Sequence, residues 1–239
     1  MKKIIILAAL ATLFGGSAIA QEKSTIGNGT TNIQIFYDFG KDRKIATTTL
    51  EGFYNDPWGN TFFFIDHYFG QKDQGRSAIN GTYFEIERGL NFWQDTKLKD
   101  LSAHVEYDGG SFGSSIFSLG AKYFLHSADF SKTFTAYVMY DKHFGAGTAD
   151  IPVKFSGVWG LNDIFGLKGL VFKGFFDFWG NNGIYADLST TKFSFLAEPQ
   201  LWYAVGKHLN LGTEIELSNN FLGHKGFMVN PCLGTKWNF

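Results

Sequence analysis

Apolar and polar residues alternate along much of the chain, and the alternation is clearest at its end. From Phe227 to Phe239 the odd-numbered positions are mostly apolar, whereas the even-numbered positions include Asn230, Lys236 and Asn238. A period of two places the two sets on opposite faces of a β-strand. Such a strand can pack its apolar face against a second protein layer, or it can turn that face toward the hydrocarbon of a membrane.

Twelve segments of this kind are separated by residues typical of turns. The pattern therefore predicts an all-β protein, and an even number of strands returns both chain ends to one side of a closed sheet. We expect a transmembrane antiparallel up-and-down β-barrel of twelve strands, with ten or fourteen strands as alternatives. The expected strands are 31–39, 44–55, 61–69, 80–93, 101–108, 115–126, 132–143, 151–161, 168–179, 191–205, 209–219 and 226–239.

The beginning of the chain has the features of a secretory signal peptide. Lys2 and Lys3 precede an apolar stretch from Ile4 to Phe14, and the small residues Ala18 and Ala20 frame a cleavage site. This stretch of about eleven residues is too short to span a bilayer core of ~30 Å as a helix. We expect residues 1–20 to be cleaved and residues 21–239 to form a single barrel domain. The alternative is an uncleaved anchor.

Composition supports a membrane barrel over other classes. Aromatic residues make up 18% of the chain, which suits the aromatic girdles of outer-membrane barrels. After the expected signal peptide no stretch approaches eighteen consecutive apolar residues, which excludes a helical membrane protein. The formal net charge of −1 gives no support for nucleic-acid binding, and the single cysteine, Cys232, cannot form an internal disulfide.

If the apolar parity faces lipid, the opposite parity lines an interior that is rich in charge. That set includes Lys173, Lys192 and Glu214, together with large aromatic residues such as Trp202. Aromatic faces beside carboxylates and ammonium groups would suit a solute with a flat ring and several hydroxyls. Equally, charges inside a narrow barrel can pair with one another simply to fill it.

Several segments resemble the nucleoside-specific channel-forming proteins of the outer membrane, the Tsx-like channels. They occur in the same order over the whole length of the mature chain, and no single motif among them is diagnostic. These segments are ATTTLEGFYNDPWGNTFFFIDHYFG (46–70), YFEIERGLNFWQ (83–94), FKGFFDFWG (172–180), FLAEPQLWYAVGKHLNLGTEIELSNNF (195–221) and the terminal Phe239.

The resemblance implies a narrow monomeric channel in which bases stack on aromatic side chains and ribose hydroxyls meet ionisable ones. Arg88 departs from the pattern, because it falls on the lipid-facing parity unless a bulge intervenes or it lies at the periplasmic rim. The first loop, Gly40 to Arg43, is short and leaves little to constrict the mouth. The positions that match the family are Phe36, Asp38, Asp66, Glu85, Arg88, Asp177, Trp179, Glu198 and Gln200, to which the interior parity adds Lys173, Trp202 and Glu214.

We therefore expect a channel in the outer membrane of a Gram-negative bacterium that passes small polar solutes, above all nucleosides, by facilitated diffusion. Its expected partners are these solutes, membrane lipids and the barrel-assembly machinery, which would recognise the strand ending in Phe239. We expect no catalytic activity, cofactor or metal.

Two alternatives remain open. One is an outer-membrane lipid or acyl hydrolase, for which Ser114 or Ser115 with His104 or His126 would be the catalytic pair; the other is a purely structural barrel. A metal site at His67 and His104 would lack further ligands at fixed spacing.

Overall fold

One antiparallel sheet accounts for nearly all of the described chain. The computed structural model describes residues 28–41, 43–70, 79–145 and 147–239, so the expected signal peptide lies outside the described residues. In chain order the strands are β1 (Asn28–Asp38), β2 (Ala46–Asp56), β3 (Gly59–Phe69), β4 (Ile79–Leu90), β5 (Leu101–Gly110), β6 (Ser114–His126), β7 (Lys132–Gly145), β8 (Val153–Leu161), β9 (Leu170–Ile184), β10 (Thr190–Ala197), β11 (Gln200–Ala204), β12 (Leu209–Phe221) and β13 (His224–Asn238). A short 3-10 helix, η2 (Ile164–Gly166), lies between β8 and β9.

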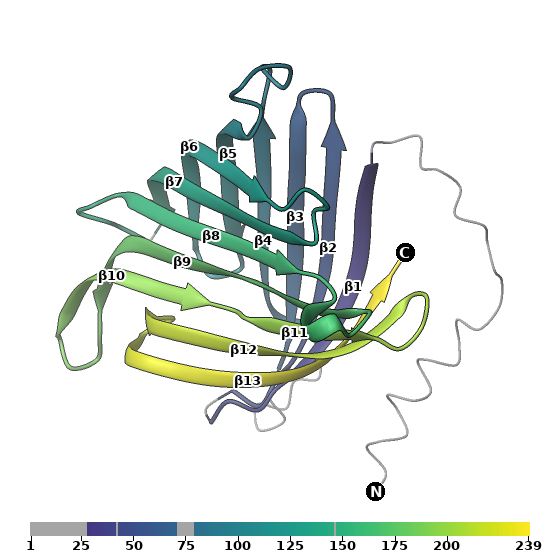
Figure 1. Cartoon of the computed structure of the whole chain (residues 1–239). Helices are drawn as coiled ribbons and strands as arrows, with labels where there is room; N and C mark the ends of the chain where they lie inside the picture. Colours follow the sequence, from purple (N-terminus) through teal and green to yellow (C-terminus); the bar gives the residue numbers. More distant parts are fainter. Residues whose placement is uncertain (1–27, 42, 71–78, 146) are drawn as a thin grey trace, which may run out of the picture.

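The sheet closes on itself because the first strand pairs with the last. Asn32 lies opposite Asn238, and the backbone N–H of Phe239 donates to the carbonyl oxygen of Thr31 at 3.0 Å. Figure 1 shows β1 beside the end of β13, with the remaining strands curling around to complete the barrel. Closure pairs the two edges that an open sheet would leave unsatisfied in hydrocarbon, at several kcal/mol for each group. We call the end of the barrel at which β1 begins and β13 ends the terminal end, and the opposite end the far end.

The thirteen strands form a barrel of twelve. β10 and β11 both lie between β9 and β12, and only Glu198 and Pro199 separate them. Pro199 has no N–H to donate to the ladder, so the strand breaks there. The N–H of Glu198 still bonds the carbonyl of Phe175, and that of Ile215 bonds the carbonyl of Pro199, so the break stays in register. The predicted count of twelve is confirmed.

The strand boundaries differ from the prediction mainly at β9. The Asn181-Asn182-Gly183 sequence is typical of a turn, but the ladder continues through it to Ile184, which lies opposite Thr190. The Asn181 amide donates to the Ser194 hydroxyl at 2.9 Å, so its polar side chain has a partner on the neighbouring strand. A turn sequence can therefore continue a strand when its side chains find partners across the ladder.

The two faces of the barrel have opposite character, as the alternation predicts. On β13, Phe227, Val229 and Leu233 are 62%, 50% and 59% exposed and point outward, whereas Asn230 and Cys232 are buried inside. The buried residues of the described chain are mostly polar, and their hydrophobic cluster comprises Phe36, Trp202 and Cys232, with the partly buried Val171 packed against it. This is the reverse of a water-soluble protein and fits a barrel surrounded by lipid. Among the described residues, no helix is long and apolar enough to cross a membrane.

Candidate functional site

The candidate site is the inner wall of the barrel, where acidic side chains outnumber basic ones. Among the described residues, five lysine or arginine side chains reach the interior: Lys122, Lys154, Lys173, Lys236 and the turn residue Arg43. In the part of the chain that the structure describes, twelve carboxylates share the inward parity, namely Asp38, Glu51, Asp66, Glu85, Glu87, Glu106, Asp108, Asp141, Asp177, Glu198, Glu214 and Glu216.

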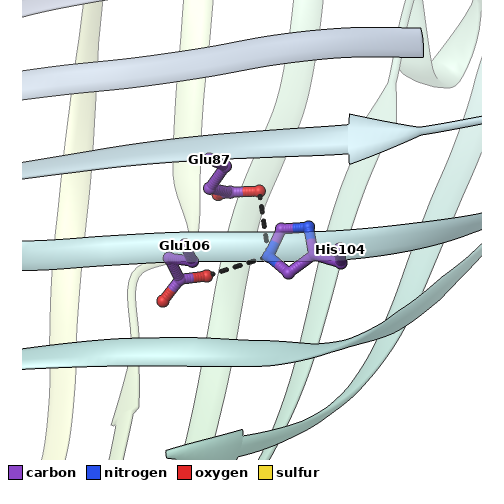
Figure 2. A group of neighbouring side chains, drawn as sticks. All are labelled: Glu87, His104 and Glu106. Atoms are coloured by element: carbon purple, nitrogen blue, oxygen red, sulfur yellow. Dashed lines mark hydrogen bonds and ion pairs between the residues drawn. The ribbon is translucent and has the colours of Figure 1, made fainter. Parts of the chain in front are cut away.

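A histidine lies between two of these carboxylates on β4 and β5. His104 is fully buried, and its Nε2 lies 3.2 Å from Glu106 Oε2 and 3.8 Å from Glu87 Oε2 (Figure 2). The imidazole and the Tyr137 ring meet edge to face at a centroid distance of 4.9 Å. On its other oxygen, Glu106 accepts a hydrogen bond of 2.5 Å from the Lys154 ammonium. The side chains of Glu87, His104 and Glu106 lie close enough to hold a metal ion, but Glu106 is already shared between His104 and Lys154.

More carboxylates surround this group, and they rely mainly on neutral donors. Asp141 accepts from the Ser118 hydroxyl at 2.8 Å, and Asp108 from the backbone N–H of Ile116 at 3.0 Å. The ammonium nitrogen of Lys154 lies 4.0 Å from Asp177 Oδ2. The acidic belt, as we call this group, consists of Glu85, Glu87, Glu106, Asp108, Asp141 and Asp177.

An ion pair crosses the bore between strands that are not neighbours in the sheet. The Lys173 ammonium on β9 lies 3.1 Å from Glu51 Oε1 on β2. The amides of Asn32 and Gln34 donate to the same carboxylate at 2.9 and 3.4 Å. The side chains of Lys173 and Glu51 remain 27% and 20% exposed although both point inward, so solvent reaches this part of the interior.

The predicted aromatic candidates Phe36 and Trp202 form a packed pair. Their ring centroids lie 5.5 Å apart, and the Trp202 indole N–H donates to Gln200 at 2.8 Å. Gln200 in turn donates to Glu214 at 2.5 Å. The Lys236 ammonium lies 4.2 Å from the centre of the Trp202 ring, a cation–π contact. Both rings are buried, and the Lys236 ammonium covers a face of the Trp202 ring.

At the far end, the Arg43 side chain of the short β1–β2 turn pairs with two inward-facing carboxylates. The Arg43 guanidinium lies 2.6 Å from a Glu216 oxygen on β12 and 3.4 Å from Asp38 Oδ2. Burial by itself lowers the pKa of Arg43, but the Glu216 and Asp38 carboxylates raise it, so that the pKa lies above its ordinary value. The turn therefore contributes the Arg43 guanidinium to the inner wall at this end. That the short turn leaves little to constrict the mouth stays a prediction.

Eleven of the twelve predicted site residues face the interior, and Arg88 does not. The β3–β4 ladder has no bulge near Arg88, so its side chain shares the outward parity of Ile86. It bonds both oxygens of Asp56 at 2.7 and 2.8 Å and the Thr61 hydroxyl at 2.9 Å, near the terminal end. Strict alternation thus places Arg88 on the outer wall at the rim.

The remaining candidates lie in three settings. Asp66 on β3 accepts from Thr49 at 2.5 Å and from the Tyr68 phenol at 3.3 Å. Trp179 meets Phe221 edge to face at 5.7 Å. Lys192, which was also expected inside, is mostly exposed and pairs with Asp150 at 3.4 Å. A register shift between residues 191 and 193 breaks the alternation there.

The residues that the sequence suggested for a hydrolase (a serine with His104 or His126) and for a metal site (His67 with His104) are not brought together. Ser115 and His126 lie eleven residues apart on β6, which is roughly 36 Å along a strand. Ser115 has the outward parity of Phe117, whereas His104 points into the bore. Ser114 shares the inward parity of His104, but it lies six residues, roughly 20 Å along β6, from Gly120, which is opposite His104. His67 lies on the outward parity of β3, so it cannot bind the same metal ion as the inward-facing His104.

Comparison with known proteins assigns the chain to a family by sequence. The family described as "Domain of unknown function (DUF5020)" matches residues 30–239, which is nearly the whole barrel. The chain belongs to the DUF5020 family. No curated protein matches this DUF5020 chain.

Solved structures share its fold. The NanC porin matches with a TM-score of 0.56 at 11% identity, covering 87% of this chain and 98% of its own. Outer membrane phospholipase A from Escherichia coli matches with a TM-score of 0.55 at 11% identity, covering 89% of this chain and 97% of its own. The calcium-bound phospholipase dimer from Salmonella typhi gives 0.54 at 12% identity, covering 92% and 94%. At these identities the likeness shows the outer-membrane barrel fold alone.

Proposed function

We propose that this DUF5020 protein is an outer-membrane channel through which small polar solutes, and nucleosides in particular, diffuse passively. The observation that carries the proposal is a closed barrel whose inward wall is charged and partly reached by solvent, with Glu51, Asp177 and Lys173 as the clearest cases. A channel of this kind needs weak sites in series and no energy source. The match to a porin fold agrees with it.

Nucleosides suit the aromatic part of the wall on β3 and β4. Phe64 and Tyr83 lie 5.7 Å apart, and Tyr83 lies opposite Asp66 in the ladder. The Tyr83 phenol bonds Glu85 at 3.2 Å. All four side chains are only half-buried, so a base could stack on the rings while ribose hydroxyls donate to the carboxylates. The resemblance to the Tsx-like channels points to the same class of solute.

The Phe36–Trp202 pair supports this proposal less directly. Because Lys236 covers the Trp202 ring, a base could stack there only after the ammonium moved aside. We assign this pair to packing of the wall and the β3–β4 aromatics to solute contact.

The remaining parts of the proposal concern location and assembly. Residues 1–20 would direct export and be removed, leaving one barrel domain that acts as a monomer. The outward apolar side chains would contact membrane lipids, and the strand ending in Phe239 would engage the barrel-assembly machinery. The likeness to a phospholipase keeps a hydrolase as the second candidate, although the candidate catalytic pairs of serine and histidine lie apart.

Solute flux into proteoliposomes tests the channel and its cargo together. We expect uridine and adenosine to enter faster than glucose, because only the nucleosides can stack on the aromatic wall. Asp66→Asn should lower the ratio of uridine to glucose flux by removing a charged acceptor, and Asp187→Asn in the exposed β9–β10 turn is the matched control. Equal entry of all three solutes would reduce the protein to a general pore. An unchanged ratio in Asp66→Asn would remove Asp66 from the site.

A further inference from the structure

The interior holds more carboxyl groups than lysine and arginine side chains that could pair with them. Within the described part of the chain, four lysines and Arg43 stand against the twelve interior carboxylates. Three of these lysines, Lys122, Lys173 and Lys236, lie near the terminal end of their strands, so carboxylates dominate the middle and the far end of the wall. Among the described residues, six of these carboxylates have no basic nitrogen within 4.0 Å. They are Asp66, Glu85, Asp108, Asp141, Glu198 and Glu214.

These six residues surround the bore instead of forming one cluster. Asp66 lies on β3, Asp141 on β7 and Glu214 on β12, and the other three lie on β4, on β5 and at the β10–β11 break. Glu198 is within electrostatic range of both Asp66 on β3 and Glu214 on β12, so charges from separate parts of the wall act on the same space. A solute that crosses the barrel would meet negative charge on several sides.

Two further observations indicate that a positive charge is missing from this wall. Asp141 is 1% exposed, and its Oδ2 is buried without a hydrogen-bond donor. The closest contacts of two interior lysines are with neutral groups, although Lys122 also acts electrostatically on Glu87, and Lys236 on Glu51. Lys122 donates to the Asn60 amide oxygen at 2.8 Å, and Lys236 lies over the Trp202 ring.

We propose that the bore is selective for positive charge: it admits inorganic cations and small solutes with protonated amines, and it excludes anions. This inference rests on the proposed channel function and defines its substrate class by charge. Carboxylates in a low-dielectric surrounding require a counter-charge, and mobile cations supply it where fixed ones do not. Rings of Asp and Glu produce cation selectivity in other pores by the same electrostatics.

The reversal potential of the purified protein in planar bilayers under a KCl gradient tests this directly. We expect K⁺ to permeate over Cl⁻ by a factor on the order of ten, because acidic clefts concentrate counter-ions by at least that much. The triple variant Asp66→Asn, Glu198→Gln, Glu214→Gln should lower this ratio toward one. The control triple Asp129→Asn, Asp150→Asn, Asp187→Asn removes the same charge from exposed turns and should keep the wild-type ratio.

Two four-carbon solutes of opposite charge extend the test to organic molecules. Putrescine should enter proteoliposomes faster than succinate, since only the former carries protonated amines. A channel that prefers Cl⁻, shows no preference, or passes succinate as fast as putrescine would overturn the charge selectivity and leave the channel function standing. A protein that gives neither conductance nor solute flux would overturn the channel function itself, and the selectivity with it.

Discussion

At the scale of single residues, Lys154 is the cation on which the acidic belt depends. Its ammonium lies 2.5 Å from Glu106 and 4.0 Å from Asp177, and its side chain is buried on the inner wall. The ion pairs at the exposed ends of the barrel, such as Lys192 with Asp150, lie mostly in solvent. Burial therefore makes the two kinds of ion pair unequal in energy.

We predict that Lys154→Met lowers the free energy of unfolding by about 3–5 kcal/mol, because it leaves buried carboxylates without their ammonium. The control Lys192→Met removes an exposed partner and should change stability by only ~0–1 kcal/mol. Unfolding in guanidinium, followed by tryptophan fluorescence in detergent micelles, measures both changes. Equal unfolding midpoints for the two variants would show that the acidic belt does not depend on Lys154.

At the scale of elements, alternation in the sequence predicts which face a side chain takes, but not what it meets across the bore. Period two placed Asp66, Asp177 and Glu214 inside because each ladder is regular around them. Contacts such as Lys173 with Glu51 join residues that are 122 positions apart in the sequence, and they depend on the stagger of the strands around the whole barrel. No local pattern contains that information.

The break between β10 and β11 is a second feature that alternation does not predict. The proline signal was present at Pro199, but the segment 191–205 was expected to be one continuous strand. In the structure the backbone at the break approaches β9 so closely that only a glycine fits opposite it. A Cβ on Gly174 would lie 2.4 Å from the Glu198 carbonyl oxygen and 3.0 Å from Pro199 Cα.

Gly174→Ala should therefore destabilise the barrel by about 1–3 kcal/mol, since backbone atoms at the break would have to shift. Gly206→Ala is the matched control, because a Cβ on Gly206 in the β11–β12 turn would meet nothing within 4 Å. Its effect should stay within about 0.5 kcal/mol. Chemical denaturation of both variants measures the difference. A Gly174→Ala protein as stable as the control would mean that the strand crosses this point without the tight approach.

At the scale of the whole molecule, the two surfaces of the barrel require different surroundings. The outer wall exposes large apolar side chains such as Leu119 and Val138, while the inner wall buries charge. A protein dissolved in water would gain by the reverse arrangement. The same inversion underlies both proposals, because an apolar exterior gives the barrel its place in the bilayer and an acidic interior gives it its preference among solutes.

Replacement of an outward leucine by arginine tests whether lipid surrounds the barrel. Leu119 lies near the middle of β6 and is 54% exposed, and Leu188 in the β9–β10 turn is 84% exposed. In water, either change at such an exposed position would stay within about 0.5 kcal/mol. In a bilayer, Leu119→Arg should cost ~2–4 kcal/mol, because its charge lies near the mid-plane, while Leu188→Arg should cost at most about 1 kcal/mol near the interface. Guanidinium unfolding of protein refolded into phospholipid vesicles gives both values. If Leu119→Arg proved as stable as Leu188→Arg, the apolar outer wall would not face hydrocarbon.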